Sequence, residues 1–141
     1  MNIPDLIKGA ESGSDVDQII LGICHLHGID TAVDYKEAFR LLSAAAGRGA
    51  SRAVVNLAFM YAEGLGIPQD LPKAISFCKK AADAGEFLAQ VELGRAYSRG
   101  LGAPADRAAA RKWYSAAADQ EGRVVDGEEL REAKAYLDSA I

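Results

Sequence analysis

The side chains best able to do chemistry in this sequence are Cys24, His25 and His27, which stand within four residues of one another. A thiolate and two imidazoles are ligands that Zn²⁺ accepts, but a zinc site needs further ligands converging from elsewhere in the fold. The sequence holds no other histidine, and its second cysteine, Cys78, stands far along the chain. We therefore predict no metal site and no bound cofactor, and we interpret both cysteines as reduced, half-buried thiols.

The sequence also lacks a recognisable catalytic motif. No Ser, Thr or Cys stands in a nucleophile signature, and the glycines at 64 and 66 lack the lysine and hydroxyl of a phosphate-binding loop. These observations predict a protein that is not an enzyme. A small hydrolytic or ligand-binding enzyme stays open as an alternative.

Composition restricts the partners. The 141 residues are half hydrophobic, which fits one folded domain, and the net charge of -4 with a pI of about 5.2 argues against nucleic-acid binding. No apolar run reaches the length that crosses a membrane. The first residues show no basic segment followed by an apolar one, so we expect no secretory signal and a cytoplasmic location.

The elements that must position any site follow a 36-residue period. Leu57, Tyr61, Gly64 and Gly66 recur as Leu93, Tyr97, Gly100 and Gly102. His25 takes the Tyr61 position and Cys24 the Met60 position in a looser first copy, which places both in the core. A fixed period of this length predicts a stacked array of one supersecondary unit.

Each unit is predicted to be two antiparallel helices joined by a short loop. Gly28, Gly64 and Gly100 should end the first helices in the left-handed conformation. Asp34 should cap a second helix in a reciprocal capping box with Glu37, and Ser51 should cap the first helix of the second unit. One large residue in each second helix, Leu41, Phe77 or Trp113, should fill the gap between neighbouring units.

We predict a single domain with this organisation: an N-terminal cap at 1–14, repeats at 15–50, 51–86 and 87–122, and a C-terminal capping helix at 123–141. The last helix, about 127–139, carries Leu130, Ala133 and Leu137 as its apolar stripe. Terminal helices of this kind cover the open apolar ends of a repeat stack.

The combined pattern resembles the Sel1-like repeat, a relative of the tetratricopeptide repeat. The middle copy carries it on Ala53, Leu57, Ala58, Tyr61, Gly64, Gly66, Asp70, Lys73, Ala74, Phe77, Ala81, Ala82 and Gly85. Residues 89–122 match again, and residues 17–49 match more loosely. The resemblance implies an all-α, right-handed α/α superhelix that serves as a scaffold for protein–protein interaction.

The first helices of such a superhelix line its concave side. With Leu57 placed inward, Val55 and Phe59 point to the opposite face, which should be polar if it is only solvated. Instead the first helices carry the apolar residues Ile19, Ile23, Val55, Phe59 and Val91 there, and Asn56, Glu92, Arg95 and Arg99 complete the groove.

We predict that these residues bind a peptide or protein partner, although burial between neighbouring first helices would also explain their character. A self-associating structural module, for example a homodimer, is the second alternative.

Overall fold

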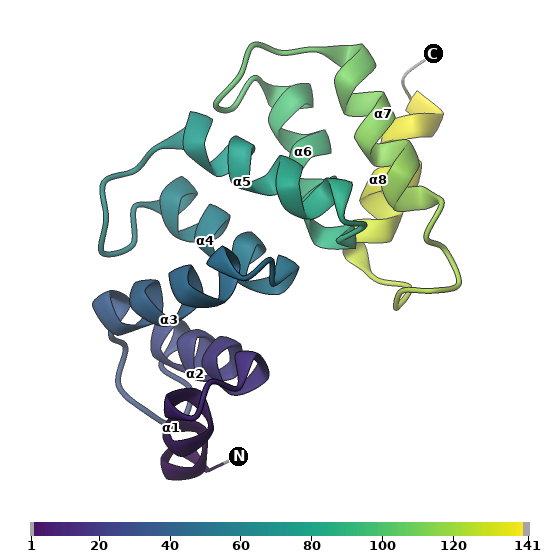
Figure 1. Cartoon of the computed structure of the whole chain (residues 1–141). Helices are drawn as coiled ribbons and strands as arrows, with labels where there is room; N and C mark the ends of the chain where they lie inside the picture. Colours follow the sequence, from purple (N-terminus) through teal and green to yellow (C-terminus); the bar gives the residue numbers. More distant parts are fainter. Residues whose placement is uncertain (1, 140–141) are drawn as a thin grey trace. The chain divides into compact units, whose positions relative to one another are not determined.

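The computed structural model describes residues 2–139 (Figure 1). Apart from an isolated bridge between Glu121 and Val124, the regular structure of these residues is α-helical. The helices are α1 (Ile3–Glu11), α2 (Asp15–His27), α3 (Tyr35–Gly47), α4 (Ser51–Glu63), α5 (Leu71–Asp83), α6 (Phe87–Arg99), α7 (Arg107–Ala118) and α8 (Glu128–Ser139). The all-α repeat fold and the capping helices predicted from the sequence are confirmed.

The chain forms two compact units: unit 1 spans Met1–Gln69 with α1 to α4, and unit 2 spans Asp70–Ile141 with α5 to α8. In each unit every helix packs against the next one along the chain. The one-domain organisation expected from the sequence remains a prediction.

The core of unit 1 begins beneath its first helix. Leu6 and Ala10 of α1 are buried against Leu21 and Cys24 of α2 and Leu41 of α3. Asn2 caps α1, since its side chain accepts a hydrogen bond from the Asp5 N–H, and a proline sits in the first turn where no N–H is needed. α1 therefore covers apolar side chains of the first helix pair, as a terminal cap must.

The loops confirm the predicted left-handed conformation of the glycines that end the first helices. Gly28, Gly64 and Gly100 end α2, α4 and α6 with φ of 69°, 67° and 68°. The second loop position also has positive φ in every copy, and Asp30 occupies it in the first copy with φ 57°. Aspartate tolerates this conformation better than most residues, which explains its presence where the other copies have glycine.

One predicted N-cap and one predicted capping box need correction. The N-cap of α4 is Ala50, which makes no side-chain capping bond, and Ser51 is already the first helical residue. Asp34 does cap α3, accepting a 3.0 Å bond from the Glu37 N–H, but the reciprocal bond is not made. The Asp34 N–H donates instead to the His25 carbonyl at 2.9 Å, and the Glu37 carboxylate pairs with Arg40.

A buried glutamine joins consecutive repeats in unit 2. Gln90 of α6 donates from Nε2 to the Ala82 carbonyl at the end of α5, over 3.2 Å, and its Oε1 accepts a 2.8 Å bond from Gln120. Gln18 makes the equivalent bond to the Ala10 carbonyl in unit 1, over 3.1 Å. The middle copy has the buried apolar Val54 in this position. The glutamines thus add a side-chain hydrogen bond to helix-end carbonyls that also accept from the N–H groups of Gly13 and Gly85.

Candidate partner-binding surface

In unit 1 the predicted binding residues share one surface, which we call the α2–α4 face: Ile19 and Ile23 on α2, and Val55, Asn56 and Phe59 on α4. The two helices contact each other directly. Phe59 is 41% exposed, and the other four side chains are half-buried. The face is therefore neither a closed core nor a solvated polar surface.

Phe59 and His27 form the aromatic part of this face. Their ring centroids lie 6.0 Å apart with a 36° tilt between the planes, so the His27 ring covers one side of Phe59. Asn56 stands one turn before Phe59 and donates a 2.8 Å hydrogen bond to the Arg52 carbonyl, which keeps its amide close to the helix. The exposed part of Phe59 remains open to a partner's apolar group.

Sequence reasoning missed two residues that extend the same surface. Val16 is 64% exposed at the start of α2, and His27 is exposed at its end. Val16, Ile23 and His27 follow helical spacing, so they lie along one side of α2. The sequence could have indicated Val16, because an apolar residue one turn before Ile19 and two turns before Ile23 lies on the same side of a helix.

The unit 2 members of the predicted set are placed differently. Val91 is 1% exposed and packs in a core with Tyr114, Ala117 and Ala133, so it cannot contact a partner in this structure. The cause is α8, which packs against both α7 and α6 and covers the side of α6 that carries Val91. Glu92 and Arg99 are exposed.

Arg95 of α6 is held by the C-terminal helix. Its guanidinium donates to both carboxylate oxygens of Glu132, at 2.7 Å from Nε and 2.6 Å from Nη2, and also bonds Glu92 at 2.6 Å. The Tyr114 hydroxyl donates to Glu132 Oε2 at 2.8 Å. The bonds from Arg95 lower the pKa of Glu132, and burial followed by the bond to Glu132 raises the pKa of Tyr114. Arg95 is thus a structural clamp for α8.

The structure confirms the predicted core position of Cys24, but His25 is less buried than predicted, and both cysteines are buried rather than half-buried. Cys24 is fully buried in the Met60 position, His25 is half-buried, and His27 faces Phe59. Burial raises the pKa of the Cys24 thiol, and it raises that of Cys78 to about 12. No group of three or more His, Cys, Asp or Glu side chains within residues 2–139 could hold a metal ion.

The geometry defines a class of protein, an α-helical repeat protein built from consecutive helix pairs. The family model described as Sel1 repeat matches residues 17–49, 51–86 and 88–121, which together are more than half of the chain. The chain therefore belongs to the Sel1 repeat family. None of the curated proteins matches it.

Solved structures agree with this assignment. A Sel1 repeat protein from Oxalobacter formigenes is 37% identical, with a TM-score of 0.77 and 95% of each chain covered. A protective antigen of uropathogenic Escherichia coli with an SLR fold is 32% identical, with a TM-score of 0.81 over 98% of this chain and 33% of that one. Cysteine rich protein B of Helicobacter pylori shares the fold at 20% identity, with a TM-score of 0.70 and coverage of 94% and 96%.

Membership sets the general expectation for function. Sel1 repeat proteins are generally non-catalytic scaffolds for protein–protein interaction. Among the residues described here, no helix is both long and apolar enough to span a bilayer.

Proposed function

We propose that this protein is a non-catalytic interaction module that binds a peptide or protein partner through the α2–α4 face of unit 1. The observation that carries the proposal is the exposure of Phe59 on a face whose other predicted members are half-buried and mainly aliphatic. A helix face that only meets solvent is normally polar. Interface energy concentrates in a few aromatic or arginine anchors, and Phe59 has this character.

Comparison with the equivalent position in unit 2 supports this choice. Arg95 stands one period after Phe59, but its guanidinium is engaged by Glu132 and Glu92. Phe59 meets the His27 ring and keeps a large exposed area. Glu92 and Arg99 are further candidates within unit 2, where a partner would contact charged side chains.

The proposal is tested by photo-crosslinking from two positions of unit 1. A benzophenone amino acid at Asn56 sits beside Phe59, whereas one at the exposed Lys36 on α3 serves as the matched control. We expect a crosslinked partner from position 56 in native lysate, absent from position 36 and lost when Phe59→Ala is added. Equal crosslinking from both positions would contradict the proposal.

Self-association is the second candidate, and the same experiment distinguishes it. An exposed apolar face can serve a second copy of the chain as well as a different partner. Crosslinks from position 56 to the protein itself, together with a dimer mass in solution that Phe59→Ala converts to a monomer mass, would assign the face to a homodimer.

A further inference from the structure

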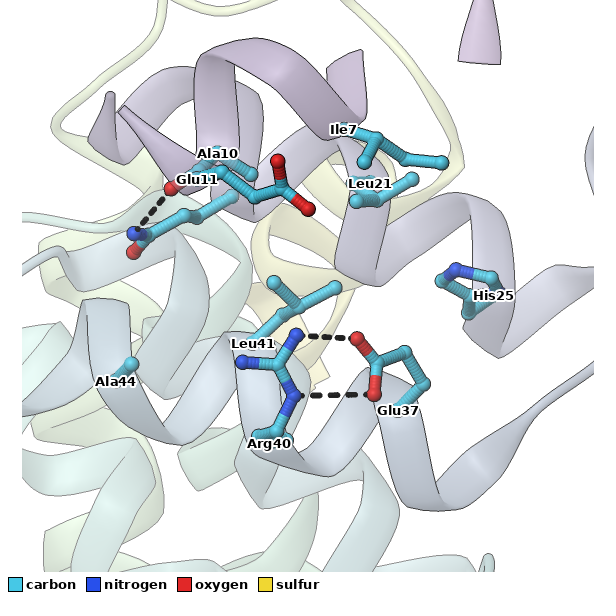
Figure 2. A pocket seen from close by; sticks show the side chains of 10 residues that line it. Ile7, Ala10, Glu11, Leu21, His25, Glu37, Arg40, Leu41 and Ala44 are labelled. Carbon is cyan, nitrogen blue, oxygen red and sulfur yellow. Dashed lines mark hydrogen bonds and ion pairs between the residues drawn. The ribbon is translucent and has the colours of Figure 1, made fainter. Parts of the chain in front are cut away.

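Unit 1 contains a pocket of about 190 Å³ where α1, α2 and α3 meet (Figure 2). Ile7, Leu21 and Leu41 supply apolar lining from these three helices. Leu21 and Leu41 belong to the buried core, and Ile7 is partly exposed at the entrance. The pocket lies on the α1 and α3 side of α2, so it is separate from the α2–α4 face.

The repeat explains why the pocket exists. His25 and Leu41 stand two periods before Tyr97 and Trp113, so unit 1 has smaller side chains where unit 2 has two aromatic rings. In unit 2 these rings are packed: Trp113 is buried, and the Lys79 ammonium lies 5.6 Å from the Tyr97 ring centroid. Lys112 lies 4.7 Å from the Trp113 ring. Unit 1 therefore lacks the aromatic filling that its own fold accommodates elsewhere.

The rim of the pocket is polar and on balance acidic. Glu11, Glu37 and Arg40 contribute two carboxylates and one guanidinium (Figure 2). Arg40 hydrogen-bonds Glu37 and lowers the pKa of that carboxyl, which keeps it ionised near neutral pH. One net negative charge beside an apolar cavity favours a ligand with an apolar body and a cationic group.

His25 adds an unused hydrogen-bonding atom to the lining. Its Nδ1 is buried and has no hydrogen-bond partner among the described residues. Buried polar nitrogens normally have a partner, from protein, water or ligand. A backbone amide of a bound peptide would supply one.

We propose that this pocket binds an aromatic side chain of a partner peptide in which a lysine or arginine stands beside the aromatic residue. The ring takes the space that Tyr97 and Trp113 fill in unit 2, and the basic group lies against the Glu11 and Glu37 carboxylates. In unit 2 a lysine ammonium likewise lies close to each ring, Lys79 beside Tyr97 and Lys112 beside Trp113.

The first test uses blocked dipeptides as probes in ¹H–¹⁵N NMR titrations of the whole chain. We expect acetyl-Trp-Lys-amide to shift the amides of Ile7, Leu21, His25 and Leu41, and to bind several-fold more tightly than acetyl-Trp-Glu-amide. Acetyl-Ala-Lys-amide should bind at least tenfold more weakly than the Trp-Lys probe. Equal shifts with the Ala-Lys probe, or shifts confined to other residues, would overturn the proposal.

Two filling variants test the position directly. Leu41→Trp introduces the residue that unit 2 has in this position, and should weaken binding of the Trp-Lys probe at least tenfold without lowering Tm. Leu41→Met keeps a side chain of similar volume and should retain binding. If Leu41→Trp does not fold, His25→Tyr places the aromatic residue of the other two repeats at the pocket and should have the same effect.

The remaining tests examine the charge preference of the pocket and its occupation by a second copy of the chain. Glu11→Gln should remove most of the preference for Trp-Lys over Trp-Glu while leaving Tm unchanged. Unaltered preference, or unaltered affinity in a folded Leu41→Trp or His25→Tyr variant, contradicts the proposal. Concentration-dependent shifts of the same four amides without any peptide would assign the pocket to a second copy of the chain instead.

Discussion

Replacing Glu132 by glutamine should loosen the C-terminal helix of unit 2. The Glu132 carboxylate accepts hydrogen bonds from Arg95 and from the Tyr114 hydroxyl, and the Arg95 and Glu132 side chains are only 27% and 26% exposed. Glutamine keeps the shape and one acceptor oxygen, but it loses the charge and presents an NH₂ group to the guanidinium.

The expected loss of stability in Glu132→Gln follows from the number of these hydrogen bonds and their exposure to solvent. Hydrogen bonds to charged groups contribute roughly 1.5–3 kcal/mol each, and partial exposure with the retained oxygen reduces the net loss. We expect Glu132→Gln to lower the free energy of unfolding by about 1–2 kcal/mol, which at this chain length lowers Tm by roughly 3–6 °C. Thermal melting followed by circular dichroism measures this shift, and hydrogen exchange should show faster exchange of the α8 amides.

The matched control is a second ion pair of the same helix. Lys134 of α8 bonds Glu121 at 2.8 Å, but this pair is exposed, so Glu121→Gln should leave Tm unchanged within error. Equal melting temperatures for the two variants would refute the conclusion that Arg95 clamps α8. So would a loss of stability in Glu132→Gln without faster exchange in α8.

Three further outcomes follow from the structure. Arg95 lowers the pKa of Glu132, so the stability that this carboxylate contributes is present above its unfolded pKa and is lost as the pH falls through its folded pKa. The Tm difference between wild type and Glu132→Gln should therefore shrink below about pH 4. Gly66→Ala should lower the free energy of unfolding, measured by denaturant titration, clearly more than Gly85→Ala does. Both glycines have positive φ, near 71° and 92°, but a Cβ at position 66 would lie 2.5 Å from Tyr35 Cβ, whereas the space around position 85 is open. Gln90→Val, which copies the middle repeat, should lower the free energy of unfolding by about 1–2 kcal/mol because Gln120 and the Ala82 carbonyl lose a partner.

Local chemistry made much of the fold predictable. The positive φ of Gly64 and Gly100 follows from glycine at a helix end, and the cap by Asp70 follows from an acidic side chain before the first turn. These features depend on a few neighbouring residues, and the 36-residue period repeats them. The Cys24 position was predictable for the same reason, since the period aligns it with the buried Met60.

The environment of the predicted binding residues was less predictable. Val91 and Arg95 belong to the same helix positions as Val55 and Phe59, but the C-terminal helix buries one and binds the other. That helix follows a segment in which the closing glycine, Gly122, arrives one residue late, so the period does not say which side chains of α8 meet α6. The position of Glu132 beside Arg95 depends on tertiary packing.

The pocket of unit 1 shows a similar limit. Aligning the repeats shows that His25 stands where the later copies have Tyr, and that Leu41 stands where they have Phe or Trp. Whether smaller side chains leave a cavity or allow the helices to close over it depends on how far the surrounding structure relaxes. Here α1 and α3 leave the space open.

The most direct test of the central claim measures Phe59→Ala twice, once in the free protein and once against the partner found by crosslinking. Because Phe59 is 41% exposed, Tm should fall by no more than about 2 °C, while titration calorimetry should show Kd raised about 30-fold, the equivalent of roughly 2 kcal/mol. Leu88→Ala in unit 2 removes an apolar side chain that is 50% exposed and should change neither value. A Phe59→Ala variant with a much lower Tm and an unchanged Kd would show that Phe59 stabilises the fold and that the partner binds elsewhere.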